Sequence, residues 1–139
     1  MKRITVPAET AQLEGVNAFI DDILDGCGCP AKVRLQVELA VEEIFVNIAS
    51  YAYHPERGET EVCVDTHGDP PTVTITFLDH GKPFNPLDKP DADVTLPAEE
   101  RGIGGLGILL VKKNMDDVTY SYENGKNILT ITKRLEAAI

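Results

Sequence analysis

The sequence has little positive charge and no long apolar run. Of its 139 residues, 13 are Lys or Arg and 23 are Asp or Glu, which gives a formal net charge of −10. Such a surface repels the phosphates of nucleic acids and anionic lipids. The apolar runs are far shorter than the ~20 residues that cross a membrane, and no apolar signal core follows the charged N-terminus. We therefore expect a cytoplasmic protein that binds neither nucleic acid nor membrane directly.

Cysteine is scarce, and one common phosphate-binding motif is missing. Cys27, Cys29 and Cys63 are odd in number, and no second Cys pair or nearby His completes the ligand spacing of a zinc site. We expect these thiols to be reduced. No Gly-Lys-Ser or Gly-Lys-Thr occurs, which excludes a Walker A loop.

The remaining composition is that of an ordinary folded domain. Hydrophobic residues make up 42% of the chain and charged residues 26%, so neither disorder nor a fibrous repeat is indicated. A chain of this length buries about two thirds of its unfolded surface around one core. We see no internal repeat and no linker, and we expect residues 1–139 to form a single domain.

The spacing of apolar residues predicts the element order β-α-α-β-β-α-β-β. Two amphipathic helices are expected at residues 13–26 and 31–51, and a third runs from a glycine cluster at Gly102 to about Met115. The strands are expected at residues 2–6, 61–65, 72–78, 118–122 and 128–134.

This order indicates an α+β fold. Strand pairs with helices grouped between them predict a two-layer α/β sandwich, in which helices cover one face of a mixed, mostly antiparallel sheet. The Asn124-Gly125 pair predicts a tight turn between the last two strands. Residues 81–100 are rich in proline and lack periodicity, and such long irregular segments are often functional lids.

The first candidate cluster is Glu43 and Asn47, four residues apart in the long second helix. This spacing places both side chains on one face, at the edge of the apolar stripe and away from the polar face with Glu38 and Glu42. An amide oxygen there can bind Mg²⁺, and a carboxylate can deprotonate a hydroxyl that attacks a phosphate. The alternative is a helix-edge pair that touches only solvent, because this spacing is common by chance.

The second candidate cluster is Asp79-His-Gly81-Lys-Pro-Phe84, directly after the strand at 72–78. Asp79 is expected at the strand's end, where its carboxylate can accept a hydrogen bond from the amino group of a base. Gly81 permits a close approach of the backbone. The alternative is an ordinary turn, since Asp, Gly and Pro all favour turns.

The third candidate cluster is Arg101-Gly-Ile-Gly-Gly-Leu-Gly107, which leads into an apolar helix. Exposed backbone amides at a helix N-terminus suit a chain of phosphates, and Arg101 is either a phosphate contact or an ordinary surface residue. The same residues also fit the G-x-G-x-x-G fingerprint of dinucleotide-binding proteins. That interpretation requires an apolar strand just before the glycines, whereas the preceding residues are rich in Pro and Asp.

The three clusters, taken in chain order, resemble the N box, G1 box and G2 box of the GHKL ATPases. The matching motifs are Glu43-x-x-x-Asn47, Asp79-x-Gly81-x-Pro83-Phe84 and Gly102-x-Gly104-Gly-x-Gly107. The resemblance spans roughly residues 30–134. The sequence from Gly105 to Lys112 is similar to that of the anti-sigma-factor serine kinases within this superfamily.

The resemblance implies a role for each residue. Glu43 would be the catalytic base and Asn47 the Mg²⁺ ligand, while Asp79 would hold the adenine amino group and Gly81 would make room for the ring. Further ATP-binding positions, most of them around the phosphates, are Phe84, Arg101, Gly102, Gly104, Gly105, Leu106 and Gly107. Residues 85–101 would form the ATP lid.

Two stretches depart from the family pattern. Family kinases often carry a His shortly after the Asn of the N box, where this chain reads Asn47-Ile-Ala-Ser-Tyr51. Many members also place Gly-Thr-Thr before the last strand, where this chain reads Gly125-Lys-Asn127.

The length suggests which branch of the superfamily the chain resembles. Histidine kinases need a further helical domain, and the topoisomerase, chaperone and mismatch-repair members need a transducer domain. The resemblance therefore implies a serine kinase that binds a sigma factor and phosphorylates a small anti-sigma-factor antagonist, and that forms a homodimer. The alternative is a nucleotide-dependent binding module without phosphoryl transfer, and a domain that binds no nucleotide is the third possibility.

Overall fold

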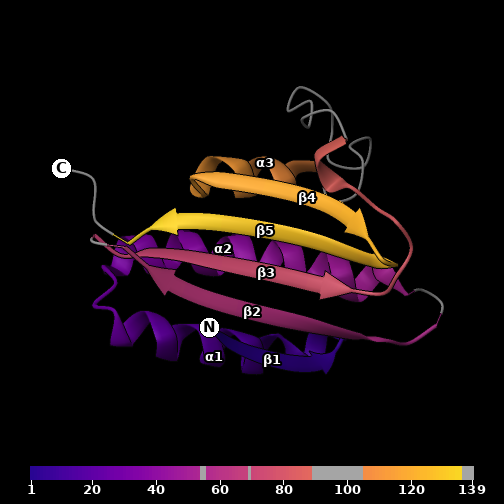
Figure 1. Cartoon of the computed structure of the whole chain (residues 1–139), viewed down its shortest axis with the longest axis horizontal. Helices are drawn as coiled ribbons and strands as arrows, with labels where there is room; N and C mark the ends of the chain where they lie inside the picture. The colour runs from indigo at the N-terminus through magenta and orange to yellow at the C-terminus, as the bar shows by residue number, and fades with distance from the viewer. Residues whose placement is uncertain (54–55, 69, 89–104, 136–139) are drawn as a thin grey trace.

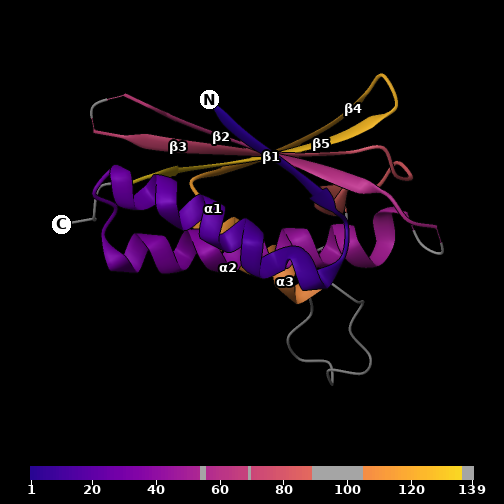
Figure 2. The same ribbon diagram turned by 90° about the horizontal axis from the view of Figure 1, so that it is seen from below.

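The computed structural model describes residues 1–53, 56–68, 70–88 and 105–135, with the backbone alone for 105–107. In these ranges five strands form one sheet, and helices cover one of its two faces, as Figures 1 and 2 show. No helix in this part of the chain is long and apolar enough to span a bilayer. The expected two-layer α+β sandwich is confirmed.

The expected element order is also confirmed, with small shifts at the ends. The strands are β1 (Lys2–Pro7), β2 (Glu59–His67), β3 (Thr72–Asp79), β4 (Asp117–Glu123) and β5 (Lys126–Arg134). The α-helices are α1 (Leu13–Gly26), α2 (Ala31–Asn47) and α3 (Gly105–Asn114). Three shorter helical segments are the 3-10 helices η1 (Thr10–Gln12) and η3 (Pro86–Asp88) and the π-helix η2 (Ile48–Ala52). The strand order is β1-β2-β3-β5-β4, and each of these neighbouring pairs is antiparallel, so no parallel pair makes the sheet mixed.

The core lies between the sheet and the helices. Alternate residues of β3 face the helices and are fully buried, namely Val73, Ile75 and Phe77. The stripe of α2 that faces them is buried as well, and it contains Val33, Val37, Ala40, Val41 and Ile44. Burying each larger apolar side chain stabilises the fold by about 1.5–3 kcal/mol. Because this stripe fixes the rotation of α2, Glu43 and Asn47 are left half-buried at its edge.

Helix α2 changes its geometry beside the candidate site. The sequence predicts one α-helix up to Tyr51, but α2 ends at Asn47 and continues as the π-helix η2. The hydrogen bonds of a π-helix span one more residue than those of an α-helix, so the buried position that would follow Ile48 after one turn moves from Tyr51 to Ala52. Tyr51 is exposed as a result, and Ala52 is buried.

The hairpin of β4 and β5 has the turn that its sequence predicts. Asn124 and Gly125 have φ angles of 53° and 77°, and two positive φ values in a row are the geometry of a type I′ turn. The pairing of β5 with β3 then places Asn127 directly opposite Asp79. A residue near the end of the chain is thereby brought to the end of a strand in its middle.

Candidate functional site

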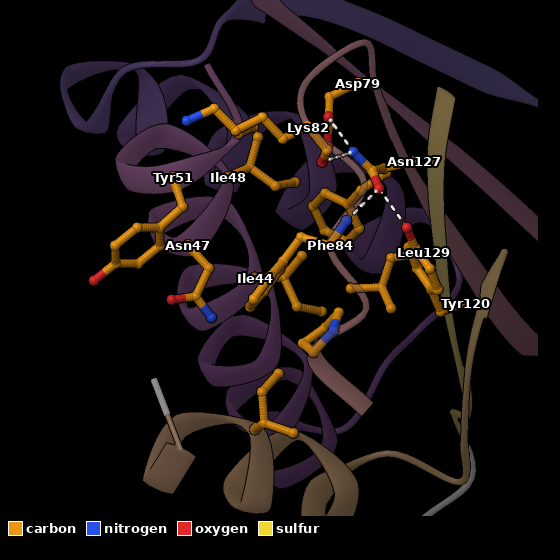
Figure 3. A pocket seen from close by; sticks show the side chains of 14 residues that line it. Ile44, Asn47, Ile48, Tyr51, Asp79, Lys82, Phe84, Tyr120, Asn127 and Leu129 are labelled. Carbon is orange, nitrogen blue, oxygen red and sulfur yellow. Dashed lines mark hydrogen bonds between the residues drawn. The ribbon is translucent and has the colours of Figure 1, made fainter. Parts of the chain in front are cut away.

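A pocket lies where α2 and η2, the end of β3, strands β4 and β5, and the first turn of α3 meet (Figure 3). Its walls are mainly apolar. The polar side chains among its lining residues are Asn47, Tyr51, Asp79, Lys82, Tyr120 and Asn127. An apolar hollow with a few convergent polar groups is the usual form of a small-molecule site.

Asp79 is the last residue of β3, as the sequence predicts, and its side chain lines the pocket. Only 4% of its surface is exposed. A carboxylate buried this deeply needs hydrogen bonds, and Oδ1 accepts one from the Gly81 backbone N–H at 2.9 Å and one from the Asn127 side chain at 2.9 Å. The expected hydrogen bond from a base to Asp79 stays a prediction.

Asn127 is a site residue that the sequence reasoning missed. The sequence marks Asn127 only as a departure from the family pattern, yet this residue is 7% exposed and lines the pocket beside Asp79. A polar residue directly before the alternating run Ile-Leu-Thr-Ile-Thr of β5 was the available signal. Its partner could not be identified without the register of β3 and β5.

Glu43 and Asn47 are brought together as predicted. The Asn47 Nδ2 donates to Glu43 Oε1 over 3.4 Å, which turns the amide nitrogen toward the carboxylate. Asn47 lines the pocket, whereas Glu43 lies one turn back along α2 and does not line it. Burial raises the pKa of the Glu43 carboxyl above its ordinary value, the hydrogen bond from Asn47 lowers it, and the neighbouring Glu42 raises it. Glu43 is thus a stronger base than an exposed glutamate.

Gly81 has a structural requirement that the sequence did not reveal. A Cβ atom at this position would lie 2.2 Å from the carbonyl oxygen of Ala52, the last residue of η2. The next backbone amide, of Lys82, donates to that same oxygen at 2.9 Å. The loop after β3 therefore packs backbone against backbone on η2. The expected role of Gly81 in admitting a ring remains a prediction beside this contact.

Replacing Gly81 by Ala should lower the free energy of unfolding by about 1–3 kcal/mol, the usual cost of forcing extra volume into a packed site. The added methyl meets backbone atoms of Ala52, which cannot rotate away. Urea denaturation would measure the loss. Gly15→Ala is the matched control, because nothing lies within 4 Å of its Cβ and alanine favours a helix by up to about 1 kcal/mol. Equal stabilities of G81A and G15A would contradict the packing.

The other predicted contacts are placed only in part. Phe84 lines the pocket, with 40% of its surface exposed. Helix α3 begins at Gly105, and its residue Ile108 also lines the pocket, so the helix N-terminus lies beside the site. The backbone of Leu106 and Gly107 belongs to this first turn. Arg101, Gly102, Gly104 and residues 89–101 of the expected lid lie outside the described residues.

Tyr51 ends the stretch after Asn47 in which the sequence departs from the family pattern. It lines the pocket from η2, on the side where Asn47 and Ile48 also lie (Figure 3). Lys82 lines the same pocket from the loop after β3. Neither Tyr51 nor Lys82 is among the site residues that the sequence predicts, because both reach the pocket only through the packing of that loop on η2.

Comparison with known proteins finds relatives in sequence and in fold. Serine-protein kinase RsbW of Listeria innocua is 28% identical over 130 residues, which cover 91% of this chain and 82% of that protein. A crystal structure of RsbU and RsbW domains from Mycobacterium tuberculosis is similar with a TM-score of 0.65 at 14% identity, over 99% of this chain and 34% of that one. The histidine kinase domain of a blue-light activated histidine kinase from Erythrobacter litoralis is similar with a TM-score of 0.52 at 17% identity. The similarity covers 94% of this chain and 62% of that one.

The two structural similarities, at such low identities, show the fold alone, and this chain spans about a third of the first structure. The family itself is shown by sequence. Residues 6–133 match the model of the histidine kinase-like ATPase domain. That match covers nearly the whole sandwich, including the pocket residues Asn47, Asp79 and Asn127, and the chain therefore belongs to the histidine kinase-like ATPase domain family.

Proposed function

We propose that this protein is an ATP-dependent serine protein kinase that acts as an anti-sigma factor. The observation that carries the proposal is the meeting of Asn47 and Asp79 at one pocket, with Glu43 hydrogen-bonded to Asn47. These residues come from two elements that are far apart in the sequence. The Listeria relative, which is named a serine-protein kinase, supports the choice of reaction.

The pocket suits a purine nucleotide. Its apolar side chains, among them Ile44, Ile48 and Leu129, offer a surface for a flat base, and Asp79 offers an acceptor at the buried end. The first N–H groups of an α-helix have no partner within the helix, and with the partial positive charge of the helix N-terminus they would favour phosphates at the start of α3. A base and its phosphates would thus span from the end of β3 to the start of α3.

Asn47 fits Mg²⁺, because its amide oxygen is a neutral oxygen ligand and its nitrogen is already used by Glu43. Mg²⁺ commonly takes one or two protein ligands and completes its shell with water and substrate phosphates. When bound, MgATP would supply the phosphoryl group with its charge partly offset. The chain itself would orient that phosphoryl group and would supply the general base, Glu43.

Glu43 would take the proton from the attacking serine hydroxyl. Its raised pKa strengthens it as a base, and the hydrogen bond from Asn47 restricts its rotation. Oε1 is the oxygen that Asn47 holds, which leaves Oε2 for the hydroxyl. Glu43 and the Mg²⁺ ligand would thus act as one unit on a single face of α2.

The partners follow from the family resemblance. We propose a small anti-sigma-factor antagonist as the phosphorylated protein, a sigma factor as the second partner, and a homodimer as the assembly. Binding a sigma factor would also place the protein in the cytoplasm. The net charge of −10 fits protein partners better than a direct contact with nucleic acid.

One observation favours a second candidate, a nucleotide-dependent binding module without phosphoryl transfer. Glu43 does not line the pocket, although Asn47 does. In that case the carboxylate would serve only to orient Asn47. The two candidates share the nucleotide site and differ in whether a phosphoryl group leaves it.

An experiment with labelled nucleotide separates the two. The purified protein is incubated with ATP labelled at its terminal phosphate and with host lysate, and the proteins are separated by size. We expect label on the serine of one small protein, and no such label with the Glu43→Gln variant. Label on no protein, together with an ATP-dependent association in a pull-down, would favour the binding module instead.

A further inference from the structure

Asn127 donates hydrogen bonds to three oxygens around the end of β3. Its Nδ2 lies 2.9 Å from Asp79 Oδ1 and 2.8 Å from the carbonyl oxygen of Lys82, with the carbonyl of Gly81 at 3.5 Å. Figure 3 shows this amide between the strand end and the loop that follows it. Both N–H groups of the amide are therefore used, one by the carboxylate and one by the loop.

The amide oxygen of Asn127 accepts two further hydrogen bonds. One comes from the backbone N–H of Phe84 at 3.1 Å, and the other comes from the hydroxyl of Tyr120 in β4. Figure 3 shows both contacts. This single side chain thus joins β5, β4, the end of β3 and the loop that leads away from it.

The orientation of this amide follows from its partners. Turning it over would place Oδ1 against the Asp79 carboxylate and the carbonyl of Lys82, which are acceptors only, and Nδ2 against the Phe84 N–H, which is a donor only. A buried amide with every donor and acceptor paired is strongly held, because each lost bond would leave a buried polar group unpaired. Asn127 is therefore a fixed reference point in the site.

This fixed amide determines how Asp79 faces the pocket. Oδ1 of Asp79 receives N–H groups from Asn127 and Gly81, and no hydrogen bond from the described part of the chain reaches Oδ2. The carboxylate lines the pocket and is nearly fully buried. Because Oδ1 is held from two sides, the carboxylate cannot rotate, and Oδ2 remains the acceptor for a ligand.

We propose that Asn127 is the positioning residue that sets the base selectivity of this site, by holding Asp79 so that Oδ2 accepts a hydrogen bond from the amino group of a 6-aminopurine. The proposal rests on the nucleotide-binding function proposed above. A 6-oxopurine would bring a carbonyl oxygen to the same position, where an acceptor would meet an acceptor. The site should therefore select adenine over hypoxanthine or guanine.

Calorimetric titration of MgATP and MgITP tests the proposal, because ITP carries an oxygen where ATP carries the amino group. We expect the wild type to bind MgATP at least about 10²-fold more tightly than MgITP, as sites built around a substrate donor do. Asn127→Leu keeps the size of the side chain and removes its hydrogen bonds. Its selectivity ratio should fall below about tenfold, because Asp79 is then free to turn.

Two further variants complete the design. Asn127→Asp keeps the contacts of Oδ1 with Phe84 and Tyr120 but places a carboxylate against Asp79, so its ratio should fall as well, and it carries the test if N127L lacks the wild-type circular dichroism spectrum. Thr130→Val is the matched control in β5. It faces the opposite side of the sheet, beside Thr76, and should keep the wild-type ratio.

The possible outcomes are distinct. Equal weakening of both nucleotides in N127L and N127D, with the ratio unchanged, would show that Asn127 only supports the fold, and it would overturn the proposal. A wild type that binds MgATP and MgITP equally would also overturn it, while leaving nucleotide binding intact. A wild type that binds neither nucleotide would end the proposed function itself, and this inference with it.

Discussion

Replacing Glu43 by Gln should leave MgATP binding close to that of the wild type and slow phosphoryl transfer to the partner serine by ~10²-fold or more, the usual effect of losing a general base. Glutamine keeps the size of the side chain and an oxygen for the Asn47 amide, so the Mg²⁺ ligand stays oriented. Single-turnover transfer of labelled phosphate measures the change, and calorimetry measures binding. Equal transfer rates in mutant and parent would remove Glu43 from the mechanism.

Glu42→Gln is the matched control for this prediction. Glu42 is an exposed neighbour on α2, and its charge affects Glu43 only by raising the pKa of that carboxyl. Its transfer rate should stay near the parent's. The pH profile gives an independent check, since a base with a raised pKa becomes protonated, and therefore inactive, at a higher pH than an ordinary glutamate. The acidic limb of the profile should shift slightly to lower pH in E42Q, because the charge that raises the pKa of Glu43 is gone, and it should disappear in E43Q.

Asp79→Asn should abolish the stabilisation of the protein by MgATP. A ligand at about 100 times its Kd stabilises the native state by about 2.7 kcal/mol, which raises the Tm of a domain of this size by about 10 °C. Asparagine can still accept the N–H groups of Gly81 and Asn127 through its oxygen, so the fold is kept. Its NH₂ group would then face the amino group of the base, where a donor meets a donor.

Thermal unfolding with and without MgATP measures this difference. Asp65→Asn in β2 is the control, since it removes the same charge from a residue that does not line the pocket. Its Tm should rise with MgATP as in the wild type. A full MgATP-dependent rise in D79N would show that Asp79 does not contact the base, and the candidate site would then need another anchor.

The local part of the site could be predicted because local geometry alone produces it. Glu43 and Asn47 share a face because four residues make about one turn of any α-helix. Asp79 stands at a strand end because Gly81 and the prolines after it interrupt the alternating pattern of β3. The Asn124-Gly125 turn likewise depends only on residues that tolerate positive φ.

The sequence by itself thus determined the order of the elements, the two-layer fold, and the pairs of site residues that lie within one element or one turn. The tertiary structure alone decided which distant residues meet. The contact of Asn127 with Asp79 depends on the register of β5 on β3, and the contact of Gly81 with Ala52 depends on where the π-helix η2 ends against that loop. Register and packing are set by the whole core at once, so no short-range pattern of residues encodes them.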